Sequence, residues 1–229
     1  MFLRVGHRGA KAYETENTIA SFLKALELGA NAVEFDVRQA REGTLVIIHD
    51  DNLKRVFAVD LRVDEASVSD LRGASGGLIP TLAEALDALA GRVEKILIEL
   101  KEPGCEDKVL DLLGSMNLRE PVILSSFHED VIERLGALDQ SVERGLIYAR
   151  HKDPIASAVR LRVRYLIPLY RLVHTKDIRE THATGLQVIV WTINSRTEAE
   201  SFAGKGVDGI VSDRPDILRE LSTAVTRDA

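Results

Sequence analysis

Four short stretches of the sequence combine imidazole or charged side chains with an apolar run. They are GHRG at 6–9, VEFDV at 33–37, VIIHD at 46–50 and ILIELK at 96–101. Together they supply two histidines suited to proton transfer, three carboxylates suited to a hard cation, and two cations suited to a phosphate group. This combination favours cleavage of a phosphate ester. The side chains concerned are His7, Arg8, Glu34, Asp36, His49, Glu99 and Lys101.

The three carboxylates predict a divalent cation site. Alternation along a strand places Glu34 and Asp36 on one face, and it places Glu99 and Lys101 on one face of another strand. Unpaired charge there is unfavourable, and a divalent cation or an opposite charge would relieve it. Oxygen ligands without cysteine favour Mg²⁺ or Ca²⁺ over zinc. The alternative is a structural network of ion pairs to Arg8 and Lys101 that needs no metal.

The elements that must position these residues alternate between strands and helices. Nine apolar runs are typical of strands, and amphipathic segments separate most of them, which predicts repeated β–α units and parallel strands. The runs are LRVG, AVEFDV, LVIIH, KILIEL, VILSSF, GLIYA, YLIPLY, QVIVWTI and GIVSD. The linker 38–43 is too short for a crossover helix, so the second and third runs are predicted to form a hairpin that turns at Glu42–Gly43.

Removing the returning strand of that hairpin leaves eight parallel strands, each expected to have a following helix. This count predicts an α/β fold, a (β/α)₈ TIM barrel with a β-hairpin after strand 2 and a short insertion at about 51–80 that shows little regular pattern. In such barrels the chemistry lies where the strands end. The segment NTIASFLKALELG at 17–29 is the clearest helix, with Asn17 or Thr18 at its start and Gly29 at its end.

Composition limits the class of protein. With 229 residues and 45% hydrophobic content, one domain spanning 1–229 is expected. The net charge of −6 and the lack of a basic block argue against nucleic acid as a partner. No signal peptide pattern and no bilayer-length apolar run is present, which predicts a cytoplasmic protein without stable membrane association. The single cysteine, Cys105, excludes an internal disulfide. A homo-oligomer is left open.

Nine motifs in order make the sequence similar to the glycerophosphodiester phosphodiesterase family. They are GHRG, ENTIASF, GANAVEFDV, VIIHDDNLKR, IPTLAEAL, ILIELK, SSFHEDVIERL, VWTIN and GVDGIVSDRP. The resemblance implies a (β/α)₈ barrel that uses a divalent metal to cleave glycerophosphodiesters to sn-glycerol 3-phosphate and an alcohol. It implies His7 and His49 as the acid–base pair. It implies Glu34, Asp36 and Glu99 as the metal ligands.

The resemblance also implies substrate contacts. Arg8 would contact the phosphate, Lys101 would neutralise its charge, and Phe127 and Trp191, which lie within family-like motifs, would pack against the glycerol carbons. The sequence departs from the family at VFAVD, 56–60, where a turn similar to Thr-Thr-Gly is usual. The short insertion fits a small soluble substrate better than a membrane lipid.

Two other functions are weighed against this one. A phospholipase-type phosphodiesterase acting on lysophospholipids would need an apolar rim, for which VFAVDLRV is the candidate, and an inactive phosphodiester-binding protein would be expected to lack a ligand or a histidine. Asn17 is interpreted as a helix-start residue only. The remaining histidines are interpreted as surface residues, namely His128, His151, His174 and His182.

Overall fold

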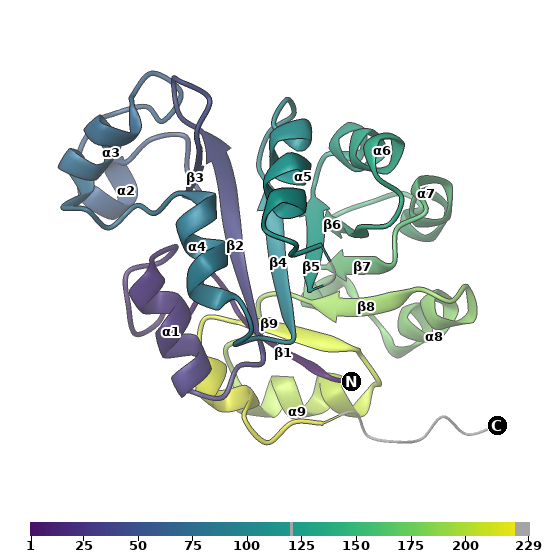
Figure 1. Ribbon diagram of the computed structural model, residues 1–229. Helices are drawn as coiled ribbons and strands as arrows, with labels where there is room; N and C mark the ends of the chain where they lie inside the picture. The colour runs from purple at the N-terminus through teal and green to yellow at the C-terminus, as the bar shows by residue number, and fades with distance from the viewer. Residues whose placement is uncertain (120, 223–229) are drawn as a thin grey trace.

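Eight parallel strands form a closed ring in the computed structural model of the chain, which describes residues 1–119 and 121–222 (Figure 1). The ring runs in the order β1-β9-β8-β7-β6-β5-β4-β2 and is closed by pairing between β1 and β2. Its strands are β1 (Leu3–Gly6), β2 (Ala32–Gln39), β4 (Lys95–Leu100), β5 (Val122–Ser126), β6 (Glu143–Tyr148), β7 (Tyr165–Pro168), β8 (Gln187–Val190) and β9 (Gly209–Ser212). The predicted (β/α)₈ barrel is therefore confirmed.

Strand β3 (Leu45–Ile47) forms the predicted hairpin with β2 and lies outside the ring. The two strands are antiparallel, with Val37 opposite Ile47. Gly43 adopts φ +83° in the turn, a conformation that favours glycine. The returning strand brings the chain back along β2, since the backbone N–H of Ile48 donates to the carbonyl of Asp36 at 3.0 Å.

Helices surround the barrel on its outer side (Figure 1). They are α1 (Ile19–Glu27), α4 (Leu82–Leu89), α5 (Glu106–Ser115), α6 (Glu129–Leu138), α7 (Pro154–Leu161), α8 (Thr175–Ala183) and α9 (Arg196–Gly204). A short 3₁₀ helix, η1 (Tyr170–Leu172), follows β7 before α8. Among the described residues β9 is followed by a second 3₁₀ helix, η2 (Pro215–Leu218), where an α-helix was expected. This single turn suffices to bury Ile217 and Leu218 in the core.

Helix α1 has the capping that its sequence predicts. The side chain of Thr18 accepts a hydrogen bond from the backbone N–H of Ser21 at 3.2 Å, and Gly29, at φ +99°, follows the last turn. The buried side of the helix presents Phe22, whose ring centroid lies 5.3 Å from that of Phe35 on β2. This contact fixes α1 against the barrel wall.

The segment 51–80 contains more structure than predicted. It forms two short helices, α2 (Lys54–Phe57) and α3 (Val68–Ser75), around a small hydrophobic cluster that it shares with Ala40, Val46 and Ile48 of the preceding hairpin. Helix α3 begins with a capping box in which Ser67 and Asp70 bond reciprocally to each other's backbone N–H groups. The Ser-x-x-Asp spacing was the overlooked signal, because helices this short give little periodicity.

None of the helices in the described part of the chain combines the length and the apolar character that spanning a bilayer requires.

The contact between α1 and β2 predicts that two neighbouring positions of α1 contribute very differently to the free energy of unfolding. Phe22 is fully buried, whereas Leu23 is 39% exposed on the same helix. Phe22→Ala should lower the free energy of unfolding by about 3–5 kcal/mol, because it leaves a cavity against Phe35. Leu23→Ala should cost less than about 1 kcal/mol. Urea denaturation of both variants checks this, and equal losses would contradict the packing described.

Candidate active site

The barrel interior changes from apolar to charged toward the carboxyl ends of the strands. On β2, Ala32 belongs to the interior cluster, and Glu34 and Asp36 follow it on the same face. On β4, Leu97 belongs to the same cluster, and Glu99 follows it. Because β2 and β4 are adjacent and parallel, with Asp36 opposite Glu99, the carboxylates are brought together at one end of the barrel.

The three predicted metal ligands form one buried cluster. An oxygen from each of Glu34, Asp36 and Glu99 lies within 4.8 Å of the others. These residues are 7%, 1% and 8% exposed, respectively. The Oδ1 atom of Asp36 is buried without a hydrogen-bond partner in the described chain. A hard cation coordinated by oxygen would satisfy such an arrangement, so the residues present fit a divalent metal.

Electrostatics supports the same fit. Burial, followed by repulsion from Asp36, raises the pKa of Glu34 well above its ordinary value and raises that of Glu99 to about 7. Burial acts in the same direction on Asp36, but the positive charges of Arg8 and Lys101 outweigh it and lower the pKa of that carboxyl. Two of the three carboxyl groups therefore favour either a proton or a bound cation.

Ion pairs neutralise only part of this charge. Arg8 Nε lies 3.2 Å from Asp36 Oδ2, and Lys101 Nζ lies 3.6 Å from Asp36 Oδ1 and 2.5 Å from Glu99 Oε1. Glu34 receives the backbone N–H of Arg8 at 2.9 Å. The structural network considered above is thus present, but it sets two cations against three carboxylates, which leaves charge for a metal ion to balance.

Each predicted histidine is oriented by an aspartate. His7 follows β1, and its Nδ1 lies 2.6 Å from Oδ1 of Asp213, which follows β9. His49 lies just past β3, and its Nδ1 lies 2.6 Å from Oδ1 of its neighbour Asp50. Neither Nε2 atom has a hydrogen-bond partner among the described residues. These atoms are therefore available for proton exchange with a bound molecule.

The surroundings of His49 favour its neutral form. Burial lowers the pKa of the His49 imidazole, and the positive charges of Lys101 and Arg8 act in the same direction. The charge of Asp36 and the hydrogen bond with Asp50 oppose these effects without cancelling them. A neutral imidazole near the carboxylate cluster can accept a proton.

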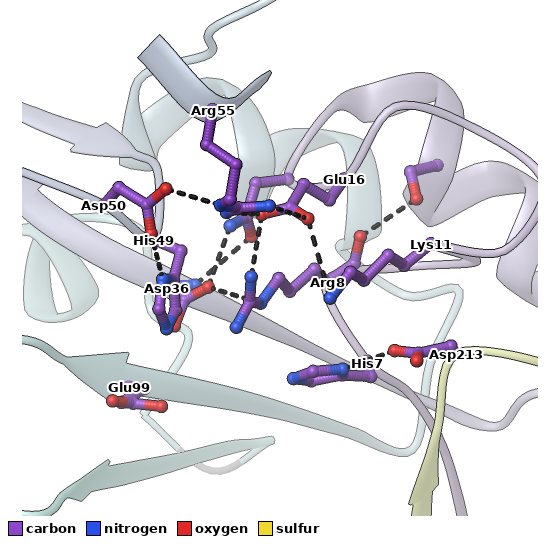
Figure 2. A network of polar contacts seen from close by, with 12 residues as sticks. His7, Arg8, Lys11, Glu16, Asp36, His49, Asp50, Arg55, Glu99 and Asp213 are labelled. Atoms are coloured by element: carbon purple, nitrogen blue, oxygen red, sulfur yellow. Dashed lines mark hydrogen bonds and ion pairs between the residues drawn. The ribbon is translucent and has the colours of Figure 1, made fainter. Parts of the chain in front are cut away.

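The backbone of GHRG explains why glycine flanks these residues. Arg8 adopts φ +51° and Gly9 φ +83°. A side chain at Gly9 would come within 2.4–2.6 Å of Ser21 on α1, so glycine is required there. The Ser21 hydroxyl and the Asn17 backbone N–H both donate to the Arg8 carbonyl, at 2.9 and 3.0 Å. This unusual turn directs Arg8 toward the carboxylates (Figure 2).

The interpretation of Asn17 as a helix-start residue only was wrong. Asn17 is 3% exposed and adopts φ +59°, while Thr18 takes the capping position. Its side-chain amide donates to Asp36 Oδ2 at 2.8 Å and accepts from the Asp36 backbone N–H at 3.3 Å. Asn17 therefore positions one of the predicted metal ligands. The sequence did not indicate this contact with Asp36, because asparagine is common at helix starts as a capping residue alone.

Asp213, Glu16 and Arg55 belong to the site but were given no role from the sequence. Glu16 accepts hydrogen bonds from both Arg8 and Arg55 (Figure 2). Asp213 could have been found because it ends the last predicted strand, just as Glu34 and Asp36 lie near the end of the second run. Glu16 directly precedes Asn17, and this pair of polar residues before the helix was the signal that could have indicated a role for Glu16 in the site.

All predicted site residues except Asp36, which lies beneath them, line one cavity of about 160 Å³. Phe127 and Trp191 form one wall, with ring centroids 5.5 Å apart in a perpendicular arrangement. Phe127 is 41% exposed, and the indole N–H of Trp191 donates to the Ile167 carbonyl at 2.9 Å. The four histidines predicted to be surface residues do not line this cavity. They are His128, His151, His174 and His182.

Comparison with known proteins agrees with this site. The sequence model of the Glycerophosphoryl diester phosphodiesterase family matches residues 7–217. The chain belongs to this family. Family membership makes it a phosphoric diester hydrolase, as the sequence motifs indicated.

Individual relatives span the whole fold. A glycerophosphodiester phosphodiesterase from Caldanaerobacter subterraneus is 30% identical, over 96% of this chain and 97% of its own. The crystal structure of a glycerophosphodiester phosphodiesterase from Thermotoga maritima is 29% identical, with a TM-score of 0.87 over 97% of this chain and 99% of its own. A phosphodiesterase from Oleispira antarctica, solved with its product sn-glycerol-3-phosphate, shares the fold at 24% identity, with a TM-score of 0.85 and 95% of each chain covered.

The carboxylate cluster predicts the effect of one isosteric substitution. Glu99→Gln keeps the shape of the side chain and removes its charge, so affinity for Mg²⁺ or Ca²⁺ should fall by about tenfold or more while the melting temperature of the cation-free protein changes little. Calorimetric titration measures the affinity. Glu102→Gln, a nearby carboxylate outside the cluster, serves as the control and should bind the cation normally. Unchanged affinity in Glu99→Gln would remove Glu99 from the ligand set.

The raised pKa of Glu99 predicts how cation binding depends on pH. A cation binds the carboxylate form, and with a pKa of about 7 much of Glu99 is protonated below neutrality. Affinity should therefore rise between about pH 6 and pH 8, with protons released on binding at the lower pH. Calorimetry in two buffers of different ionisation enthalpy counts those protons. Binding without proton release at about pH 6 would contradict the assigned environment.

Proposed function

We propose that this chain is a metal-dependent hydrolase that cleaves glycerophosphodiesters to sn-glycerol 3-phosphate and an alcohol. The observation that carries the proposal is the meeting, in one cavity, of a buried carboxylate cluster with two aspartate-oriented histidines, at the end of the barrel where the strands finish. Membership of the family and the name of the relative from Caldanaerobacter subterraneus support the same substrate class.

Glu34, Asp36 and Glu99 would hold the cation, for which Mg²⁺ or Ca²⁺ fits an all-oxygen ligand set. When bound, the cation supplies positive charge that lowers the pKa of a nucleophilic hydroxyl and stabilises the phosphate. Asn17 holds Asp36 from one side and Arg8 holds it from another, so this ligand keeps its orientation through two different contacts.

The two histidines would move the protons. One Nε2 accepts the proton of the attacking hydroxyl or water, and the other donates a proton to the oxygen of the departing alcohol. Because Asp213 and Asp50 each accept from Nδ1, both rings are held in the orientation that presents Nε2 to the cavity. The lowered pKa of His49 supports its neutral form in the free enzyme.

Arg8 and Lys101 would stabilise the charge that develops on the phosphate, since both line the cavity beside the carboxylates. Phe127 and Trp191 would pack against the glycerol carbons on the opposite wall. This division places charged groups around the phosphate and apolar groups around the carbon chain.

The structure gives no separate support to the lipid-cleaving alternative. In the VFAVDLRV stretch, Phe57, Val59 and Leu61 pack against the hydrophobic cluster between the insertion and the hairpin instead of forming an apolar rim. An inactive binding protein is also disfavoured, because every matched ligand and histidine is present at the site. The cytoplasmic location stays a prediction, and a homo-oligomeric state stays open.

Incubation of the purified protein with three substrates tests the proposal. Glycerophosphocholine and glycerophosphoethanolamine should be hydrolysed with Mg²⁺ or Ca²⁺ and not with EDTA, with sn-glycerol 3-phosphate as the product. Lysophosphatidylcholine should be a poor substrate. Preference for the lysolipid would favour the alternative, and binding without turnover of any of the three would overturn the proposed activity.

The paired histidines predict a selective rescue. His7→Ala and His49→Ala should each lower kcat by about a hundredfold or more, the range expected for a lost general acid or base. A glycerophosphodiester of p-nitrophenol has a leaving group that needs no protonation, so it should restore turnover only in the variant that lacks the general acid. Steady-state kinetics with both substrates measures this. Rescue of neither variant would refute the division of roles.

A further inference from the structure

Arg55 reaches the site from outside the barrel. It lies on α2, within the insertion, and its guanidinium contacts two carboxylates at once (Figure 2). Its Nε donates to Asp50 Oδ2 at 2.6 Å. Its two terminal nitrogens donate to Glu16, with Nη1 3.0 Å from Oε2 and Nη2 2.6 Å from Oε1. A planar fork with several donors can make these three contacts, and an ammonium group cannot.

Each of these two carboxylates also contacts a residue of the site through one of its own oxygen atoms. Asp50 Oδ1 lies 2.6 Å from Nδ1 of His49, and Glu16 Oε1 accepts from Arg8 Nη1 at 2.7 Å. Arg55 is therefore the central member of a continuous chain of contacts that joins a proposed proton-transfer group to a proposed phosphate contact. Removing it would take from Asp50 its arginine partner and would leave Glu16 held by Arg8 and Lys11 alone among the described residues.

The neighbouring arginines keep the carboxyl groups of Glu16 and Asp50 ionised. Burial favours the protonated form of Glu16, but hydrogen bonds from Arg55 and the charge of Arg8 lower its pKa to about 2. The pKa of Asp50 is also lowered, because the hydrogen bonds from Arg55 and His49 outweigh its partial burial. Both groups are thus carboxylates throughout the neutral range and can accept hydrogen bonds from their partners.

The other histidine has no such dependence on the insertion. Asp213, which orients His7, receives the side-chain amide of Asn194 at 2.7 Å. Asn194 and Asp213 both follow strands of the ring, β8 and β9, so the barrel itself supplies this support. The two histidines therefore differ in what fixes their aspartates.

We propose that Arg55 is a positioning residue for hydrolysis: its guanidinium fixes Asp50 on His49 and Glu16 on Arg8, so that the insertion sets the geometry of the site. The inference rests on the proposed function and assigns a role in it to a side chain that lines no part of the cavity. Because Arg55 lines no part of the cavity and its hydrogen-bond partners are Asp50 and Glu16, its loss should slow turnover more than it weakens substrate binding.

Two substitutions and a matched control test this role. Arg55→Ala should lower kcat for glycerophosphocholine by about tenfold or more, with KM within about threefold of the wild-type value. Arg55→Lys keeps the charge but not the fork, so it should recover only part of the rate. Arg62→Ala is the control, because Arg62 is an equally exposed arginine of the insertion whose ion pairs, to Asp51, Asp64 and Glu65, lie outside the site. It should leave kcat unchanged.

A double-mutant cycle with Asp50→Asn identifies the route of the effect. If Arg55 acts through Asp50, Arg55→Ala should change kcat much less in the Asp50→Asn background than in the wild type. An equal change in both backgrounds would overturn the part of the assignment that concerns His49. Full recovery by Arg55→Lys, or a kcat for Arg55→Ala equal to that of Arg62→Ala, would overturn it altogether. Melting curves ensure that all variants are compared where they are folded.

Failure of the inference can be told apart from failure of the proposed function. If the wild type does not hydrolyse glycerophosphocholine with Mg²⁺ or Ca²⁺, the proposed function fails. If the wild type turns over and Arg55→Ala does so equally well, only the role of Arg55 fails.

Discussion

Mutual repulsion among three buried carboxylates is the constraint on which the rest of this site depends. Two unit charges about 4–5 Å apart repel by about 3–4 kcal/mol at an effective dielectric constant of about 20. Glu34, Asp36 and Glu99 are held at such separations by the pairing of β2 with β4, and the backbone cannot relax without breaking the ring. Neighbouring groups must therefore supply positive charge and hydrogen bonds, and those groups are the ones that chemistry on a phosphate requires.

The groups that balance this negative charge come from segments that are distant in the sequence. Arg8 and Asn17 approach Asp36 from the loop between β1 and α1, and Lys101 approaches it from the end of β4. Arg8 also contacts Glu16, and Lys101 also contacts Glu99. From Asp36 outward, the Asp36 carboxylate, the Arg8 guanidinium, the Glu16 carboxylate and the Arg55 guanidinium therefore alternate in charge (Figure 2).

Much of the fold and part of the site could be predicted from the sequence, for reasons that particular residues make clear. Alternation along a strand is a local rule, so the shared face of Glu34 and Asp36 follows from their spacing. The contact between His7 and Asp213 joins positions 206 apart, and no local rule indicates it. Asn17 was misread because a positive φ, which the sequence does not reveal for a residue other than glycine, turns its side chain inward.

Strand β3 lies outside the closed ring, and this placement gives the two histidines unequal mechanical support. His7 directly follows a strand paired on both sides, whereas His49 follows a three-residue arm that pairs with β2 and is also bridged to the 80–81 segment, where the backbone N–H of Ile47 donates to the Pro80 carbonyl. A short arm outside the ring can open locally at a lower free energy than the barrel needs to unfold. Changes in the length or the contacts of this arm are therefore expected to act on His49 while the ring that carries the remaining site residues stays intact.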